Sequence, residues 1–546
     1  MSLRSKLGNI YYRVKYYLQT IHAQKKDTKA EIDFIGRMSR YKVLWRKENK
    51  KIVLSQLVTD HAMCIKNASV SKNIADKFRA NIGICVAESR IETPSYNIGD
   101  VLEKMYLKAF ERKKERIYLS FGGKIVFRNT THYKNSRLVN ALYMEIRSEI
   151  KTKEDVTKIM VKDLIVGDLI YDTYLRHNNK ATMDIDDPFL DTVIIETIHM
   201  YIGSKELFNR YEIVALVNSY GAYPHWGVLL RLCLKKNIPV FTIGGTYSIV
   251  HQVAEEYPSH LNNHFNFNRL FSSLNNKEDL LQEAKGAFEK RFSGKIDQGI
   301  GYMKVSSFSD YHNSELEGMD WSKTVVILAH CFFDSPHVYR SLLFPDHYEW
   351  ICHTLDYFSA RPDVQVLIKQ HPNGTSGNDA VFEKLKSIYS KPNLRFIDKR
   401  TSNNQLIKAR PCAVITSYGT PACEFAYFNI PVVTLYDNPF TAYNFVFTTR
   451  SIPEYEEVLG NVLNLSITPD KTEILEYYYM QHMHFTKGVI HDYLKVEKYN
   501  GRTGSNEFLV DFLPVMTEDY LKNVDTAISK GMDLIEWENK QIDYRK

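Results

Sequence analysis

The second half of the chain alternates short apolar runs with segments of helical periodicity, and this alternation restricts the fold more than any other feature. Between residues 324 and 435, the runs TVVIL, VQVLI, NLRFI, AVI and IPVVTL are each followed by polar or turn-forming residues. Strands that alternate with helices over short loops are typical of a doubly wound parallel sheet. We therefore expect one such lobe over residues 318–510.

The first half follows the same plan. Its strand-like runs, separated in part by amphipathic helical stretches, are KIVLSQLV (51–58), NIGICVAE (81–88), EIVALVN (212–218) and IPVFTIGG (238–245). A chain of 546 residues also exceeds the roughly 100–200 residues typical of one domain. We expect a basic amphipathic segment at 1–50, a first Rossmann-like lobe over 51–310, and a C-terminal helix in 511–546 that crosses back onto the first lobe.

The composition is that of a globular protein in a reducing compartment. Hydrophobic residues make up 44% of the chain, enough to build large cores. The seven cysteines are scattered and include no C-x-x-C pair, so neither a disulfide framework nor a zinc site is indicated. The chain has no run of about 18 apolar residues and no signal-peptide pattern. We therefore expect a cytoplasmic protein.

Positive charge is concentrated at the N-terminus. Residues 1–50 contain 13 Lys and Arg against 4 Asp and Glu, a surplus of 9 that exceeds the net charge of +7 for the whole chain. In residues 1–25, apolar side chains recur at three- and four-residue spacing between the basic ones. Such a helix either lies on an anionic membrane surface or packs on the body of the protein. Nucleic-acid binding is not expected, because the basic surplus does not continue.

The stretch LIKQHPN (367–373) ends a strand-like run in charged and polar residues. Lys369 and His371 follow the apolar residues directly, and Pro372 stops helix continuation. In open α/β sheets, ligands bind outside the carboxyl ends of the strands. A cationic Lys369 and a protonated His371 at this position would supply positive potential for an anion.

A second corner lies in TSYGTPACE (416–424). A strand ends before Ser417, the chain turns through Gly419 and Thr420, and Pro421 suits the first position of a helix. The free N–H groups of that helix, with the two hydroxyls, form a candidate anion site. The alternative is structural, with Thr420 capping the helix and Glu424 completing a capping arrangement.

Together the two corners resemble a known group. IKQHPN followed by TSYGTPACEFAYFNIPVV is similar to the donor half of bacterial GT-B glycosyltransferases of the capsule-polysaccharide and Kdo-transferase type, which carry a His-Pro motif. The resemblance implies a GT-B-like fold with two Rossmann-like lobes facing a cleft. It implies that Glu424 approaches the ribose, and that His371, Ser417, Gly419 and Thr420 hold the phosphate of a nucleotide-sugar. Lys369 and Pro372 complete the set of residues that we expect to bind the nucleotide.

The acceptor hydroxyl needs a general base, which we expect from the first lobe. The candidates are Asp172, which we prefer, and also Asp168 and His225. The carboxylates of MDIDDP (183–188) are further candidates, or else an exposed turn. Other residues expected in the cleft are His330, Asp334, Gly244 and Gly245.

The function expected from these features is metal-independent glycosyl transfer, without a cofactor, from a nucleotide-sugar to a surface-polysaccharide or lipid-linked acceptor. One alternative is a CDP-polyol phosphotransferase of the teichoic-acid type. Another is a non-catalytic glycan-assembly protein with a degenerate nucleotide pocket. Oxidoreductase and kinase functions are not indicated, because neither G-x-G-x-x-G after the first strand nor G-x-x-x-x-G-K-[ST] occurs.

Overall fold

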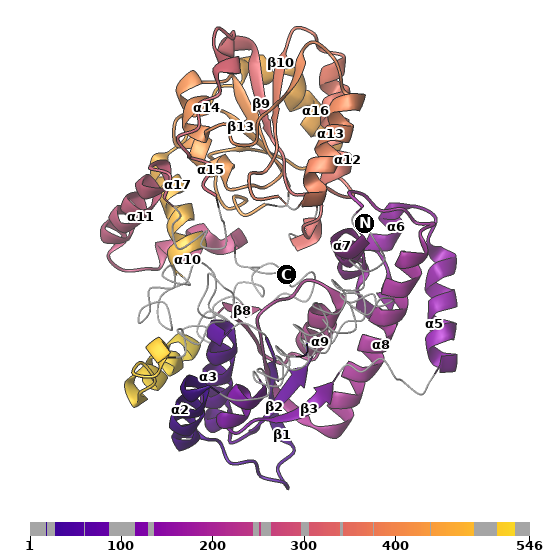
Figure 1. Ribbon diagram of the computed structural model, residues 1–546, viewed down its shortest axis with the longest axis vertical. Helices are drawn as coiled ribbons and strands as arrows, with labels where there is room; N and C mark the ends of the chain where they lie inside the picture. The colour runs from indigo at the N-terminus through magenta and orange to yellow at the C-terminus, as the bar shows by residue number, and fades with distance from the viewer. Residues whose placement is uncertain are drawn as a thin grey trace, which may run out of the picture.

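The computed structural model describes most of both lobes. The described residues are 18, 28–58, 61–86, 115–128, 136–178, 180–243, 250–252, 264–295, 305–338, 342–374, 376–436, 438–484 and 510–529. Gly244, Gly245 and nearly all of residues 1–25 therefore lie outside the described residues. The chain builds two α/β lobes, each around its own six-stranded sheet (Figure 1).

The first sheet has the order β3-β2-β1-β6-β7-β8. Its strands are β1 (Lys51–Gln56), β2 (Asn81–Val86), β3 (Lys124–Arg128), β6 (Glu212–Asn218), β7 (Val240–Thr242) and β8 (Val250–Gln252). The strands pair in parallel except β8, which runs antiparallel to β7. Helix α3 (His61–Phe78) connects β1 to β2, and α9 (Pro224–Lys235) connects β6 to β7.

A mainly helical insert with its own hydrophobic core lies between β3 and β6. It consists of α5 (Ser136–Glu149), α6 (Lys153–Thr157), the hairpin β4 (Met160–Val161) and β5 (Leu164–Ile165), α7 (Gly167–Asn178) and α8 (Pro188–Arg210). In Figure 1, α6 and α7 reach toward the second lobe near α12 (His347–Ser359). This insert places α7, with Asp168 and Asp172, against the second lobe.

The second sheet is parallel throughout, in the order β11-β10-β9-β12-β13-β14. Its central strand β9 is buried at every position, as expected of a strand covered on both faces. The strands are β9 (Thr324–Leu328), β10 (Gln365–Lys369), β11 (Leu394–Ile397), β12 (Ala413–Ile415), β13 (Val432–Leu435) and β14 (Phe447–Thr449). The two parallel-stranded lobes confirm the fold class expected from the alternating pattern.

Further helices cover the second sheet or connect its strands. Besides α12 they are α13 (Ser376–Ile388), α14 (Asn403–Ala409), α15 (Pro421–Ala426), α16 (Ile452–Gly460) and α17 (Lys471–Tyr479). Short 3-10 turns are η1 (Ser39–Tyr41), η2 (His264–Asn266), η4 (Ser314–Leu316), η5 (Trp321–Lys323), η6 (Pro336–Val338) and η7 (Val462–Asn464), and a π-turn η8 (Met480–His484) follows α17.

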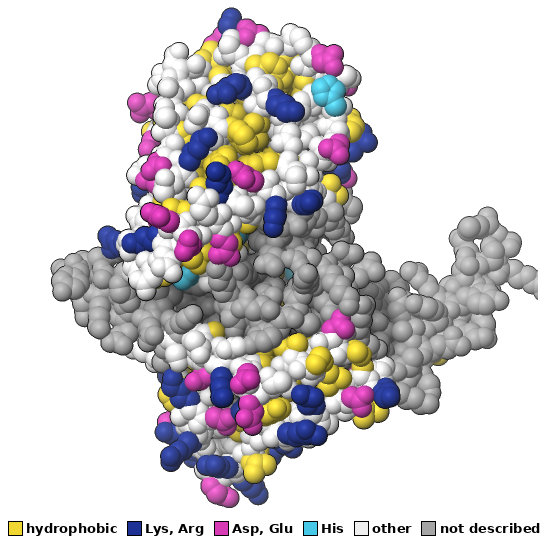
Figure 2. Space-filling view, turned by 90° about the vertical axis from the view of Figure 1, so that its left-hand side faces the viewer, with side chains coloured by type: hydrophobic (Ala, Val, Ile, Leu, Met, Phe, Trp, Pro, Cys, Tyr) yellow, Lys and Arg dark blue, Asp and Glu magenta, His cyan; other side chains and the backbone are white. Residues whose placement is uncertain are grey.

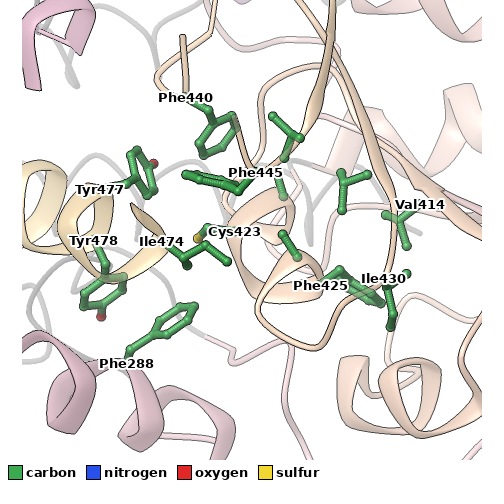
Figure 3. Close-up of a cluster of buried hydrophobic side chains, with 14 of the residues drawn as sticks. Phe288, Val414, Cys423, Phe425, Ile430, Phe440, Phe445, Ile474, Tyr477 and Tyr478 are labelled. Atoms are coloured by element: carbon green, nitrogen blue, oxygen red, sulfur yellow. The ribbon is translucent and has the colours of Figure 1, made fainter. Parts of the chain in front are cut away.

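Helices α10 (Phe267–Ser272) and α11 (Lys277–Phe292) pack into the core of the second lobe. The Phe288 ring of α11 lies 4.7 Å from that of Tyr478 on α17, and both lie in the same apolar cluster as Cys423 of α15 (Figure 3). The sequence analysis assigned residues up to 310 to the first lobe. By packing, these two helices belong with the second.

The C-terminal segment crosses back onto the first lobe, as expected. Residues 510–512 and 518–529 are helical, and Phe512 packs 6.2 Å from the ring of Phe34 on α2 (Lys29–Met38). The Asn73 side chain of α3 donates a hydrogen bond to the carbonyl of Leu521 at 2.6 Å. The crossing fixes the end of the described chain to the lobe in which it begins.

The view in Figure 2 shows Lys and Arg interspersed with Asp and Glu over the exposed surface of both lobes. Mixed charge of this kind is typical of a solvated surface. None of the helices in the described ranges combines the length and the apolar character needed to cross a membrane.

Candidate active site at the switch point of the second sheet

The direction in which successive strands are added to the second sheet reverses at β9. The chain passes from β9 to β10 on one side and later returns to β12 on the other side, so β9 and β12 flank a topological switch point. Ligands of doubly wound sheets bind outside the carboxyl ends of the strands at such a point. His330 follows β9, His371 follows β10 and Ser417 follows β12.

Stacked aromatic rings bring these three strand ends together. The imidazole of His330 stacks on that of His347, with ring centroids 4.4 Å apart, and lies 4.8 Å from the Tyr418 ring and 6.2 Å from the His371 ring. Nε2 of His347, in the first turn of α12, lies 3.1 Å from the Tyr418 hydroxyl. The corners that the sequence singled out therefore meet in one cluster.

The imidazoles in this cluster are neutral at neutral pH. Burial lowers the pKa of His330 and of His347, and burial together with nearby His330 lowers the pKa of His371 to about 4. Nδ1 of His371 accepts a hydrogen bond from the backbone N–H of Asn373 at 3.1 Å, which leaves the ring proton on Nε2. The expectation of a protonated His371 was wrong, since His371 offers a neutral N–H donor.

Several buried polar atoms at the switch point have no hydrogen-bond partner in the described part of the protein. They are Oγ of Ser417, whose side chain is fully buried, and Nδ1 of both His330 and His347. Buried polar atoms without hydrogen-bond partners are rare in native proteins, so each one needs a physical explanation. Three such atoms at the switch point indicate a place for a polar ligand.

Lys369 and Thr420 are linked by a buried polar network. Nζ of Lys369 donates to Asn403 Oδ1 at 2.6 Å, and Nδ2 of Asn403 lies 3.4 Å from Oε2 of Glu424. Arg291 forms an ion pair with Glu424 at 2.7 Å and donates to Thr420 Oγ1 at 3.2 Å. Burial lowers the pKa of Lys369 to about 8, while the nearby Glu424 carboxylate opposes that shift.

Two expectations change because of this network. Glu424 was expected to approach a ribose, but its carboxylate is 2% exposed and neutralises Arg291. Thr420 was considered as a helix cap, but its side chain accepts from Arg291 and makes no capping hydrogen bond to α15. Helix α15 is short, with only six residues.

Pro372 and Gly419 shape the backbone of the corners. Pro372 lies in a turn in which the N–H of Gly374 donates a hydrogen bond to the carbonyl of His371 at 3.2 Å. A Cβ at Gly419 would lie 3.0 Å from Oγ1 of Thr416 and 3.1 Å from Cδ of Pro421. Glycine therefore permits the tight approach of the strand end to the helix.

Asp172 meets the second lobe at a histidine. Its Oδ1 lies 2.6 Å from Nδ1 of His337 in η6, and both side chains are largely buried. Burial raises the pKa of Asp172 to about 6, partly offset by the nearby His337. The carboxylate favoured from the sequence thus lies at the interface between the lobes.

Asp168 is not available as a base. Its two carboxylate oxygens bind Arg231 of α9, at 2.7 Å to Nη1 and 2.5 Å to Nη2, and both side chains are at most 5% exposed. A carboxylate held in a buried ion pair with two hydrogen bonds is a structural group. Asp168 therefore anchors α7 to α9.

Asp334 lies beside the cluster, near His330 and His371, whereas His225 lies in the first lobe. His225, at the start of α9, stacks on Tyr223 with ring centroids 6.0 Å apart and lines a small first-lobe cavity with Gln56 and Asn218. Burial lowers its pKa to about 3, so it is a neutral ring. Asp334 is exposed and accepts a hydrogen bond from the N–H of Ser335 at 3.0 Å.

The carboxylates of MDIDDP are structural. Asp187 caps α8 by accepting from the N–H of Phe189 at 2.9 Å, and Lys180 pairs with both Asp184 and Asp187. The turn interpretation is therefore the better one for this segment.

The sequence analysis missed His347, Asn403 and Arg291. One signal could have led to the cluster, because the tripeptide Ser-Tyr-Gly follows the fourth strand of both sheets, at 219–221 and at 417–419. The Tyr418 hydroxyl donates to the Ser335 carbonyl at 3.3 Å, and the side chain of Ser335 lies near Tyr220. Both repeats thus converge on the loop that carries His337.

Within the described ranges, no group of three or more His, Cys, Asp or Glu side chains is arranged to hold a metal ion. The fold and the site together define an α/β protein of two Rossmann-like lobes with a cluster of buried polar side chains at the switch point of its second sheet.

The similarity of the chain to known proteins is low. No protein-family model and no curated protein sequence matches the chain. Among solved structures, a Thermosulfurimonas dismutans KpsC, described as a beta Kdo 2,4 transferase, matches at 10% identity over 50% of this chain and 85% of its own, with a TM-score of 0.32. UDP-GlcNAc 2-epimerases from Methanocaldococcus jannaschii (78% of this chain, 97% of its own) and Neisseria meningitidis (88% and 100%) match at 10% identity, with TM-scores of 0.26 and 0.20. The strand order of the two sheets, rather than these scores, carries the fold class.

Proposed function

We propose that the protein transfers a sugar from a nucleotide-sugar donor, a CMP-ulosonic acid or a nucleoside diphosphate sugar, to a hydroxyl of a growing surface polysaccharide or lipid-linked glycan. The observation that carries the proposal is the switch point of the second sheet. There, polar atoms of His330, His347 and Ser417 are buried and have no hydrogen-bond partner among the described residues, and His371 and Lys369 lie nearby with their donor groups. The oxygens of a phosphate ester suit the Ser417 hydroxyl and a ring N–H of His330. Nδ1 of His347 is an acceptor, because Nε2–H of the neutral ring donates to the Tyr418 hydroxyl, and it suits an O–H of the ligand.

The chemistry of transfer fits this arrangement. Negative charge grows on the departing phosphate in the transition state, and preorganised donors stabilise it most effectively in a site that excludes water. Lys369 is mostly charged at neutral pH, since its pKa is about 8. Nε2–H of His371 and Oγ of Ser417 add neutral donors around the same phosphate.

The nucleotide is testable without knowledge of the sugar. We expect one member of a panel of CMP, CDP, UDP, GDP and ADP to raise the thermal unfolding midpoint, because a ligand that binds only the native state stabilises it by about 2.7 kcal/mol at a hundred times its Kd. Differential scanning fluorimetry measures the shift. Substitution of Ser417 by Val should abolish it, whereas His312→Ala, on the exposed surface, should not.

A panel without any shift, checked by isothermal titration calorimetry, would contradict nucleotide binding. If a nucleotide does bind, analysis of the product decides the reaction. A glycosidic linkage supports the proposal, and a phosphodiester linkage would assign the protein to the CDP-polyol phosphotransferases instead.

The basic start of the chain gives a separate prediction about the acceptor. If residues 1–25 hold the protein at a lipid-linked substrate, the full chain should sediment with vesicles containing anionic lipid and lose most of that binding when these residues are deleted. Vesicles of neutral lipid serve as the control. Equal sedimentation of both forms would assign residues 1–25 to packing on the protein itself.

A further inference from the structure

We infer that His337, held by Asp172 from the other lobe, is the group that takes the proton from the acceptor hydroxyl. Asp172 is then a positioning residue and not the base itself. The inference rests on the proposed function for its substrate, but the side-chain pair can be tested without a substrate.

The pair is built from two parts of the chain that only tertiary structure brings together. Asp172 comes from α7 of the first-lobe insert, and His337 from η6, in the loop after β9. Oδ1 and Nδ1 are 2.6 Å apart, with side chains 4% and 11% exposed. Asp172 also accepts a hydrogen bond from the backbone of His337, so the carboxylate holds both the ring and the turn.

The orientation of the His337 ring is fixed on a second side. The Tyr171 ring packs edge-on against it, 4.9 Å between centroids, and the Tyr171 hydroxyl donates to Asp346 Oδ2 at 2.7 Å. Asp346 in turn caps α12 and accepts from Thr182. These contacts leave the imidazole little freedom to rotate.

The two ring nitrogens have different surroundings. Nδ1 faces the Asp172 carboxylate, whereas Nε2 makes no hydrogen bond to any residue in the described part of the chain. A carboxylate on Nδ1 selects the tautomer with the proton on that nitrogen, so the lone pair of the neutral ring lies on Nε2. Nε2 is therefore the atom able to accept a proton.

The charged groups around the pair favour its function. His337 faces Asp172 and Asp168 from α7 and Asp346 and His347 from the start of α12, and Arg231 neutralises Asp168. Although burial opposes it, the Asp172 carboxylate raises the pKa of His337. A raised pKa makes the neutral imidazole a stronger base.

The proposed step balances in protons and electrons. The acceptor O–H gives its proton to Nε2, and an oxygen lone pair forms the new bond to the anomeric carbon. The bond from that carbon to the phosphate oxygen breaks, and its electron pair stays on the departing nucleotide. The imidazolium formed is stabilised by the Asp172 carboxylate at Nδ1.

Further contacts hold the insert to the second lobe beside the pair. Lys153 of α6 pairs with Glu349 of α12 at 2.5 Å, and Thr182 donates to Asp346 at 2.7 Å. The Asp172–His337 pair is thus complete only when the two lobes meet in this arrangement.

The first test needs no substrate. In the full-length protein with histidine-selective ¹⁵N labelling, we expect the neutral ring of His337 to carry its proton on Nδ1 and the Asp172→Asn variant to lower the pKa of His337. Resonances are assigned with His337→Asn. A neutral ring protonated on Nε2, or a pKa that Asp172→Asn does not move, overturns the inference whatever reaction the protein catalyses.

The second test uses turnover with the donor identified by the nucleotide panel. His337→Ala should lower kcat by about 10²- to 10⁴-fold and leave the thermal shift caused by the nucleotide intact. The rate should rise with pH through the pKa of His337, above 6.5, because only the neutral ring accepts a proton. In Asp172→Asn this limb should move to lower pH, with a reduced plateau.

Glu456→Gln provides a matched control, because Glu456 pairs with His353 at 3.1 Å on the same lobe. This variant should leave both the turnover rate and the pH dependence of the rate unchanged. If His337→Ala turns over at the wild-type rate, the inference fails while the proposed function stands. If the wild-type protein binds no nucleotide, the proposed function fails. The tautomer of the His337 ring then decides by itself whether Asp172 positions His337.

Discussion

The His371→Ala variant is expected to lose about 10²- to 10³-fold in kcat and to bind its nucleotide more weakly, as is typical when one preorganised donor to a developing anion is removed. The lost group is the neutral Nε2–H, since Nδ1 is already occupied by the N–H of Asn373. Because the ring is uncharged at neutral pH, the defect should be nearly constant between pH 6 and 8. Initial rates at limiting and saturating donor separate the effects on binding and on kcat.

His312→Ala is the matched control for this variant, because His312 lies on the same lobe with a side chain that is 63% exposed. The free energy of unfolding of both variants should lie within about 1 kcal/mol of the wild-type value. Wild-type turnover by His371→Ala under both donor conditions would remove the residue from the mechanism.

The Glu424→Ala variant is expected to destabilise the second lobe by about 3–5 kcal/mol, because it leaves the Arg291 guanidinium buried without its counter-charge. The two side chains are 2% and 3% exposed, and their ion pair measures 2.7 Å. Removal of the carboxylate also takes away the charge that supports the Lys369 ammonium, so the pKa of Lys369 should fall below about 8. Nucleotide affinity at neutral pH should fall with it.

Urea unfolding measures the first effect and nucleotide titration the second. Glu315→Ala is the control, because its ion pair with Arg395 is solvent-exposed and worth at most about 1 kcal/mol. The double variant Arg291→Met with Glu424→Leu should recover much of the stability, since an apolar pair has no charge to bury. A Glu424→Ala protein as stable as Glu315→Ala would contradict the structural role given to this pair.

The sequence predicted the two lobes well because their signal is local. Continuous apolar runs such as TVVIL mark strands covered on both faces, and helical periodicity between them leaves few alternatives to a doubly wound sheet. The insert of α5 to α8 and the assignment of α10 and α11 to the second lobe were not predicted. Those features depend on which core an apolar helix face joins, which periodicity does not specify.

The polar corners were predicted from position, but their protonation and partners were not. His371 and Ser417 were found because polar residues at strand ends are unusual in an apolar pattern. The neutral state of His371 follows from burial among other imidazoles, and the pairing of Glu424 with Arg291 follows from the packing of α11. Neither is encoded within a few residues of the corner.

The amino-acid sequence by itself determined the alternation of strands and helices, the polar ends of β10 and β12, and the choice of Asp172 as a residue of interest. Only the tertiary structure brought Asp172 to His337, across 165 positions of the chain, and occupied Glu424 and Asp168 with arginines. The physical reason is range. Hydrophobic periodicity acts between near neighbours, whereas burial and charge pairing depend on which distant elements share a face.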